Sequence, residues 1–157
     1  MLNYNQALPD QTLLQDLQMK EIKPIMKLII RGKKREFISA VGKSLNILLP
    51  TEANTSTQSD KLTALWLSPD EWMIFSNEPV DEETNNYETE ELLNKNISKL
   101  NLGAITDVTD QFVMINLKGS KIYELFQTGS PFNFNDFKNK KGAVAQTILT
   151  KIDIIIH

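Results

Sequence analysis

Two carboxylates three residues apart, Asp107 and Asp110, are the residues whose types and spacing most directly suggest chemistry. Paired carboxylates can exchange protons with a substrate or bind a cation. They also begin and close turns, because an aspartate side chain accepts hydrogen bonds from nearby backbone amides. The pair brackets the end of an expected strand, so we favour the turn.

The cluster of basic residues at Arg31–Arg35 is a second candidate, because such clusters can contact phosphates. No aromatic residue that could stack on a base lies within it, and Glu36 follows directly. We therefore interpret it as a solvated turn or as a contact to an acidic partner. Binding of nucleic acid remains a third hypothesis, which the net charge of −3 disfavours.

Trp66 and Trp72 lie on either side of a Ser-Pro-Asp turn that contains Asp70. Two tryptophans at a turn could enclose a small ligand. Aromatic residues in hairpins more often belong to the core or fix an interface, and we favour those roles.

Two further segments are unusually apolar for their expected surroundings. Phe132, Phe134 and Phe137 alternate with polar residues in an expected loop, so they either fold into the core or contact a partner. Ile154–Ile156 forms an apolar strand whose edge needs to be covered. The predicted interface residues are Trp66, Asp70, Trp72, Phe132, Phe134, Phe137, Ile154 and Ile156.

The composition excludes several kinds of catalytic site. There is no cysteine, so the chain has no disulfide, thiolate nucleophile or cysteine-bound metal. The single histidine, His157, leaves no histidine for a triad or a two-histidine metal site in the body of the domain. Glycine-rich phosphate-binding loops are missing as well. We therefore predict no catalytic, cofactor-binding or metal-binding residue on this chain.

The apolar runs are far shorter than the roughly 20 residues that cross a bilayer, and residues 1–10 do not resemble an export signal. We expect a cytoplasmic protein without attraction to membranes.

The periodicity of apolar residues predicts one α+β domain, with an antiparallel or mixed sheet and helices on one face. Residues 1–22 are expected to be an N-terminal segment with a short helix over Asp10–Lys20, and residues 23–157 to be the domain. Strands are expected at 25–31, 62–67, 71–75, 103–108, 112–117, 142–150 and 152–156. Helices are expected at 34–45 and 119–127. A further helix is expected from the acidic segment 78–91 to about Leu100, with Leu92, Leu93, Ile97 and Leu100 buried.

Seven short motifs occur in the order found in one known family. They are I-x-R-G at 29–32, L-P-T-E-x-N-T at 49–55, L-W-L-x-P-D-E-W at 65–72, D-V-T-D-Q at 107–111, L-x-G at 117–119, S-P-F-x-F at 130–134 and A-Q-T at 145–147. Each motif is weak alone, but the series resembles the gamma subunit of heterotetrameric sarcosine oxidase. The resemblance spans residues 23–157.

This resemblance implies a fold related to the folate-binding aminomethyltransferase of the glycine cleavage system. It also implies a non-catalytic role beside the large (alpha) subunit, with beta and delta subunits in the same complex. FMN, FAD or NAD and tetrahydrofolate would reside on those partners, which oxidise sarcosine to glycine, produce hydrogen peroxide and transfer a one-carbon unit.

Two departures from the family qualify what it implies. Ser130 stands where family members often have cysteine. Family chains also tend to continue beyond the position of His157, so the resemblance implies either a shortened chain or an unpaired last strand. The alternative function is a stand-alone folate-binding or aminomethyltransferase-like protein, which rests on kinship of fold alone.

Overall fold

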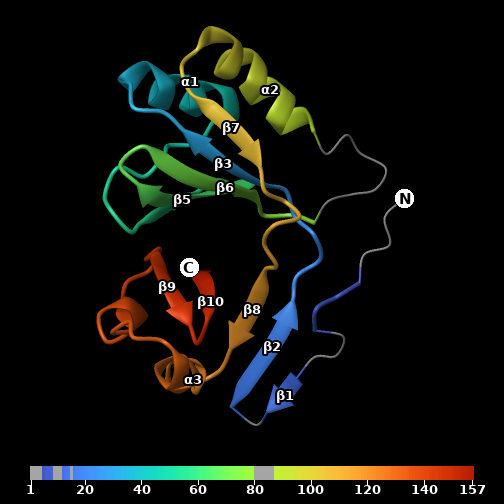
Figure 1. Ribbon diagram of the computed structural model, residues 1–157, viewed down its shortest axis with the longest axis vertical. Coiled ribbons are helices and arrows are strands. Elements are labelled where there is room, and N and C mark those ends of the chain that lie inside the picture. Colours follow the sequence, from blue (N-terminus) through green and yellow to red (C-terminus); the bar gives the residue numbers. More distant parts are fainter. Residues whose placement is uncertain (1–4, 9–11, 15, 80–86) are drawn as a thin grey trace.

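The computed structural model describes residues 5–8, 12–14, 16–79 and 87–157. Within these residues the chain is an α+β domain, which confirms the predicted fold class. Its strands are divided among three antiparallel sheets instead of one, and α-helices α1 and α2 cover one face of the largest sheet (Figure 1).

The largest sheet has five strands in the order β4-β5-β6-β3-β7. Its strands are β3 (Lys27–Arg31), β4 (Ser56–Gln58), β5 (Leu62–Ser68), β6 (Glu71–Ser76) and β7 (Ala104–Asp107). The helices on it are α1 (Arg35–Leu45) and α2 (Glu88–Asn96), which is followed by the 3-10 turn η1 (Ser98–Leu100). The predicted hairpin of residues 62–75 is β5–β6, with a bulge between Trp66 and Ser68.

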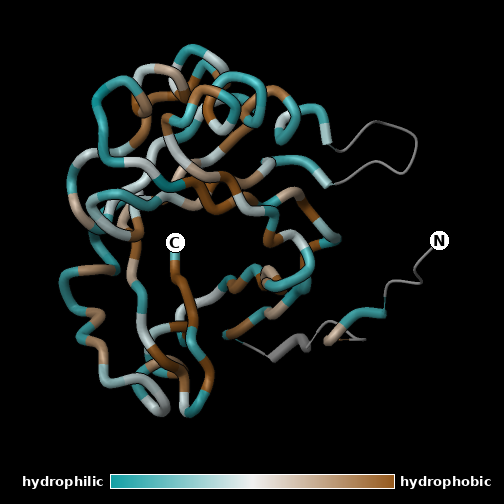
Figure 2. The backbone as a smooth tube through the Cα atoms, turned by 45° about the horizontal axis from the view of Figure 1, so that its top comes forward, coloured by the Kyte–Doolittle hydropathy of each residue, from teal (hydrophilic) through white to brown (hydrophobic). Residues whose placement is uncertain are grey.

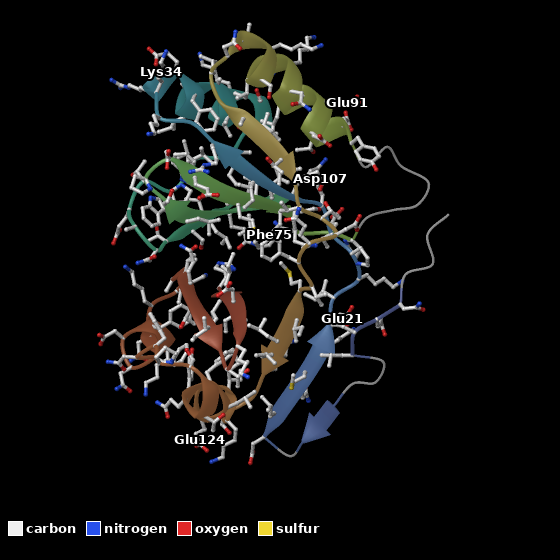
Figure 3. All side chains as sticks on the ribbon, viewed as in Figure 1. Glu21, Lys34, Phe75, Glu91, Asp107 and Glu124 are labelled. Atoms are coloured by element: carbon white, nitrogen blue, oxygen red, sulfur yellow. The ribbon has the colours of Figure 1, made fainter. Side chains whose placement is uncertain are left out.

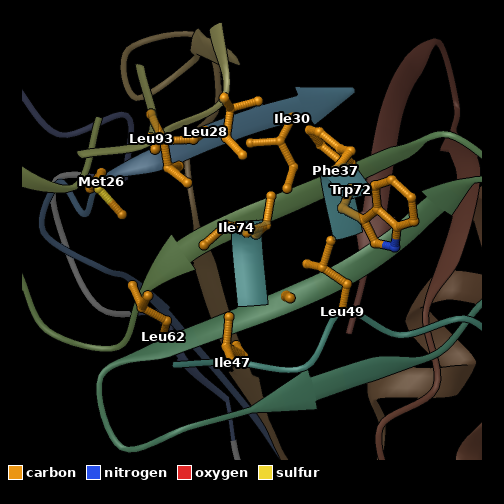
Figure 4. Packing of buried hydrophobic residues seen from close by; sticks show 13 residues of the cluster. Met26, Leu28, Ile30, Phe37, Ile47, Leu49, Leu62, Trp72, Ile74 and Leu93 are labelled. Carbon is orange, nitrogen blue, oxygen red and sulfur yellow. The ribbon is translucent and has the colours of Figure 1, made fainter. Parts of the chain in front are cut away.

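The main core lies between this sheet and its two helices (Figure 4). Leu28 and Ile30 of β3 point to this side, and Phe37 and Val41 of α1 meet them. This side-chain alternation is the period of two that a strand imposes, and the spacing of four on α1 is that of one helical face.

Strand β6 is buried on both faces. Trp72 and Ile74 belong to the core under the helices, whereas Met73 and Phe75 belong to a second cluster on the opposite face. Phe75 lies between the sheet and the C-terminal hairpin (Figure 3). A strand covered on both sides needs a continuous apolar run, which explains the sequence W-M-I-F.

The other half of the molecule contains two small sheets. One has the order β1-β2-β8, and the other is the C-terminal hairpin β9–β10. The elements are β1 (Thr12–Leu14), β2 (Leu17–Glu21), β8 (Ile115–Lys118), α3 (Ile122–Gly129), η2 (Phe137–Asn139), β9 (Ala145–Leu149) and β10 (Ile152–Ile156).

The predicted N-terminal helix is wrong. Those of its residues that the structure describes belong to β1 and β2, apart from Asp16 between them; the two strands pair with each other, and β2 also pairs with β8. Along β2 the exposed Gln18 and Lys20 alternate with more buried neighbours, which is a strand pattern. Pairing with a strand about a hundred residues away determines this structure, and the local spacing of leucines could not indicate it.

The prediction that Leu92 and Leu100 are buried is also wrong, because they are 38% and 62% exposed. Leu93 and Ile97 are fully buried, as expected. The α-helix ends at Asn96, and the tighter 3-10 turn that follows places Leu100 off the buried face. None of the helices within the described residues has the length and apolarity to cross a membrane.

Candidate functional site

Trp72, a predicted interface residue, belongs to the chain's own core. It is 2% exposed, its ring lies 5.9 Å from that of Phe37, and its indole N–H donates to the carbonyl oxygen of Pro50 at 2.8 Å. Two family motifs, around residues 50 and 72, therefore meet in a buried hydrogen bond. Trp66 is partly buried against the same core.

Asp70 organises the turn of the hairpin. Its carboxylate accepts a hydrogen bond from the Ser68 hydroxyl at 3.0 Å, and its carbonyl oxygen accepts one from the amide of Gly32 at 3.0 Å. The Nζ of Lys33 lies 3.8 Å from the carboxylate. This arrangement places the basic cluster of residues 31–35 beside the hairpin turn, with most of its charges exposed. An exposed pair of this kind contributes little to stability.

The phenylalanine loop folds inward at its centre. Phe134 is 1% exposed and stacks on Phe126 at 5.3 Å between ring centroids. Phe132 and Phe137 lie edge-on to Phe134 and are only partly buried. The sequence left open whether these phenylalanines fold into the core or contact a partner. Phe134 lies in the core, whereas Phe132 and Phe137 have partly accessible rings.

The C-terminal strand β10 pairs with β9 on one side, and within the described strands its other edge has no partner. Ile154 and Ile156 are partly buried, and Ile155 packs against the second core cluster. The strand is mostly apolar (Figure 2), with Asp153 as its charged residue, and Ile152 at its start is 67% exposed. The expected apolar terminal strand is present, and the contact of Ile154 and Ile156 with a partner stays a prediction.

The A-Q-T motif attaches this hairpin to the rest of the chain. The side-chain amide nitrogen Nε2 of Gln146 donates to the carbonyl oxygen of Leu67 at 2.7 Å, and the hydroxyl oxygens of Thr147 and Ser130 are 3.1 Å apart. A fourth motif, at residues 49–55, contacts the residue that precedes A-Q-T, since the backbone amide of Val144 donates to the carbonyl oxygen of Asn54 at 2.9 Å. The motifs thus cross-link segments that are distant in sequence.

Asp107 and Asp110 form the turn that we favoured from the sequence. The Asp107 carboxylate accepts a hydrogen bond from the amide of Thr109 at 2.8 Å, and the amide of Gln111 donates to the carbonyl oxygen of Val108 at 3.0 Å. Asp107 lies at the end of β7 (Figure 3). Within the described residues, no group of three histidine, aspartate or glutamate side chains could hold a metal ion.

This turn contacts a buried lysine that sequence reasoning passed over. Lys27 is 3% exposed, and its Nζ donates to the carbonyl oxygen of Ile25 at 3.0 Å. Its own amide donates to the Thr109 hydroxyl at 3.0 Å, and its carbonyl oxygen accepts from Val108 at 2.9 Å. Burial lowers the pKa of Lys27, and the negative charges of Asp110 and Asp107 oppose this effect. The feature of the sequence that could have indicated this buried lysine is its position as the single charged residue in the apolar run of residues 25–30.

Lys27 lines a cavity of about 160 Å³ between two connecting segments, which we call the connector cavity. One connector runs from β2 to β3 and the other from β7 to β8, and the Ile22 amide donates to the carbonyl oxygen of Met114 between them at 2.9 Å (Figure 1). The lining residues are Ile22, Lys23, Pro24, Lys27, Thr109, Asp110, Phe112, Val113 and Met114.

Comparison with known proteins places the chain among others of this fold. The family described as "sarcosine oxidase, gamma subunit family" matches residues 31–157. A chain of the heterotetrameric sarcosine oxidase from Corynebacterium sp. U-96, solved in complex with pyrrole 2-carboxylate, matches with a TM-score of 0.76 and 15% sequence identity. The match covers 92% of this chain and 72% of that chain, and establishes a shared fold. No curated protein matches the sequence significantly.

Proposed function

Because the chain belongs to the sarcosine oxidase gamma subunit family, we propose that it is a non-catalytic subunit of a heterotetrameric sarcosine oxidase complex. Its main partner is the large (alpha) subunit, and beta and delta subunits complete the assembly. The reaction is the oxidative demethylation of sarcosine to glycine, with production of hydrogen peroxide and transfer of the one-carbon unit to tetrahydrofolate. FMN, FAD or NAD and tetrahydrofolate are bound by the partner subunits, and the complex is cytoplasmic.

The observation that carries this proposal is the use of the family motifs within the fold. Trp72 binds the carbonyl oxygen of Pro50, Asp70 binds Ser68 and Gly32, and Gln146 binds the carbonyl oxygen of Leu67. These polar groups serve contacts inside the chain instead of converging on one reactive centre. Such a use is expected of a subunit that contributes shape and surface to a complex.

The exposed apolar side chains support assembly with a partner. Ile152 and Ile148 are exposed on the C-terminal hairpin. Phe112 and Val113 are exposed on the connector before β8, and Ile115 is exposed at the start of that strand. Exposed apolar groups gathered on one part of a surface commonly mark an interface. A stable interface buries on the order of 1,600 Å² in total. Leu48, Leu92 and Leu100 of the helix-covered half are exposed as well. We place the contact with the large subunit on the half that contains β8 and β10, because no residue of these two strands is buried within the chain.

Co-expression tests the proposal directly. The chain is tagged and expressed with the large, beta and delta subunits, and the material retained on the tag is analysed for subunits, flavin absorbance and sarcosine oxidation. We expect a yellow, sarcosine-oxidising assembly that contains the chain. A colourless protein recovered alone would contradict the proposal. Saturable binding of tetrahydrofolate to that protein would then favour the stand-alone folate-binding alternative.

A further inference from the structure

We propose that the connector cavity receives a carboxylate side chain, aspartate or glutamate, from a partner subunit, with the Nζ of Lys27 as the hydrogen-bond donor. This inference rests on the proposed function, because it assumes that the chain works within a complex. It assigns a polar contact to a surface that the proposed function describes only as apolar.

The hydrogen-bonding state of Lys27 is the first reason. An ammonium group has three N–H donors, and within the described residues Nζ makes one hydrogen bond, to the carbonyl oxygen of Ile25. None of the ion pairs between described residues involves Lys27. A buried cation with unused donors is costly, and an incoming carboxylate would satisfy both its charge and its donors.

The charges around the cavity favour an anion. Its charged lining residues are Lys23, Lys27 and Asp110, so the formal charge of the lining is +1 with both lysines protonated. Asp107 acts on Lys27 from outside the lining, and its carboxylate already accepts the Thr109 amide. Asp110 is exposed, so its charge is screened by solvent more strongly than that of Lys27.

The size of the cavity suits the end of one side chain. Its volume of about 160 Å³ is close to the ~150 Å³ of an engineered cavity that binds a benzene molecule. A carboxymethyl or carboxyethyl group is smaller than benzene and fits this space.

The surroundings of the cavity favour a protein segment over a free small acid. Phe112 and Val113 line the cavity and are exposed, and Ile115 continues the apolar surface onto β8. A small acid would leave these side chains in water, whereas a protein segment would cover them. Interface hot spots lie in desolvated pockets whose neighbouring contacts exclude water, and these apolar side chains would exclude water from a carboxylate bound to Lys27.

The test compares Lys27→Met with Lys23→Met in the full co-expressed complex. Methionine keeps a long flexible side chain but removes the charge and the donors, and Lys23 is an exposed lysine of the same cavity. Removing one member of a buried charge pair should weaken assembly on the order of 30-fold. We expect this loss for Lys27→Met, and a change below about threefold for Lys23→Met, because exposed charges contribute little.

Two additional measurements keep the result interpretable. The thermal midpoint of isolated Lys27→Met should equal or exceed that of the wild type, because a buried charge has been removed, so lost assembly would not reflect unfolding. Phe112→Ser should also weaken assembly, by a smaller factor.

Each outcome bears on a distinct claim. Wild-type chain that captures no subunit would overturn the proposed function and this inference together. Wild-type and Lys27→Met chains that assemble equally well would overturn the carboxylate contact alone. If, in addition, sodium acetate but not sodium chloride at equal ionic strength raised the thermal midpoint of wild type only, the cavity would bind a free carboxylate instead.

Discussion

The two halves of the molecule differ in how completely they bury their own apolar residues. In the helix-covered half, the side chains of Ile30, Phe37, Val41 and Ile74 are entirely inaccessible to solvent. In the other half, strands β8, β9 and β10 consist largely of exposed or half-buried residues, although β10 is nearly all isoleucine. The first half has a closed core, although Leu48, Leu92 and Leu100 are exposed on its surface. The second half has apolar strands that the chain itself covers only in part.

This difference explains why family motifs occur in both halves. Motif residues in the first half, such as Trp72, support a closed core. Those near β9, such as Gln146 and Thr147, fix the position of a hairpin whose apolar surface stays accessible. A subunit benefits from both, because a rigid half can hold an apolar surface ready for its partner.

The largest loss of stability should come from a truncation in the core of the helix-covered half. Trp72→Ala removes the largest fully buried side chain and leaves the Pro50 carbonyl oxygen without its donor. We expect the free energy of unfolding of the isolated chain to fall by about 3–5 kcal/mol, as for other large core truncations. Urea denaturation followed by circular dichroism measures this. Trp72→Phe should cost less, since it keeps an aromatic ring, and a Trp72→Ala chain as stable as wild type would contradict the core position.

The second effect should show that the other half has a small core of its own. Phe134→Ala should lower the free energy of unfolding by about 3 kcal/mol, because the ring is buried within a cluster of four aromatic neighbours. Phe132→Ala is the matched control and should cost about 1 kcal/mol, since that side chain is only partly buried. Equal losses for the two variants would show that the loop does not order around Phe134.

The sequence was sufficient for elements whose determinants are local. The α1 helix follows from the inward spacing of Phe37 and Val41, and the β5–β6 hairpin follows from two apolar runs around Pro69. The sequence was insufficient where pairing with a distant strand determines the secondary structure, as in β1 and β2. It was also insufficient for the division into three sheets, because alternation along a strand does not identify its neighbour.

The candidate site was predictable only in part. The apolar strand β10 could be predicted from its isoleucines, of which Ile152 is exposed and the consecutive three at 154–156 are partly buried. Assigning Trp72 and Phe134 to an interface conflicts with their burial, because one sequence does not distinguish an aromatic residue of the core from one of an interface. The burial of Lys27 depends on the turn at residues 107–111, which lies about eighty residues away and could not be located from spacing.

The third prediction concerns assembly with the partner subunits, and it compares a surface substitution in each half. Ile152→Lys alters an exposed residue of the open half, and Leu100→Lys alters an equally exposed leucine of the helix-covered half. Neither should change the stability of the isolated chain by more than about 0.5 kcal/mol. In the co-expressed complex, we expect Ile152→Lys to weaken assembly about tenfold and Leu100→Lys to leave it unchanged. The reverse order would place the partner on the helical side.

The smallest effect should come from the contact between the halves at His157. Its ring lies 6.3 Å from that of Phe75, and its Nε2 lies 2.9 Å from the Ser56 hydroxyl oxygen. Burial lowers the pKa of His157 below its ordinary value of 6.5. The unfolded chain then binds a proton more readily than the folded chain, so stability is lost as the pH falls below about 6.5.

His157→Gln removes this titration. The free energy of unfolding is measured by urea denaturation at pH 7.5 and 5.5 for wild type and variant. The wild-type value minus the variant value should be slightly smaller at pH 5.5, because titrating carboxylates contribute equally to both proteins and cancel in the difference. Parallel pH profiles would mean that the ring is as well solvated in the folded chain as in the unfolded one. The C-terminal hairpin would then be held on the five-stranded sheet by Gln146 and by the apolar contacts of Ile155, without a contribution from His157.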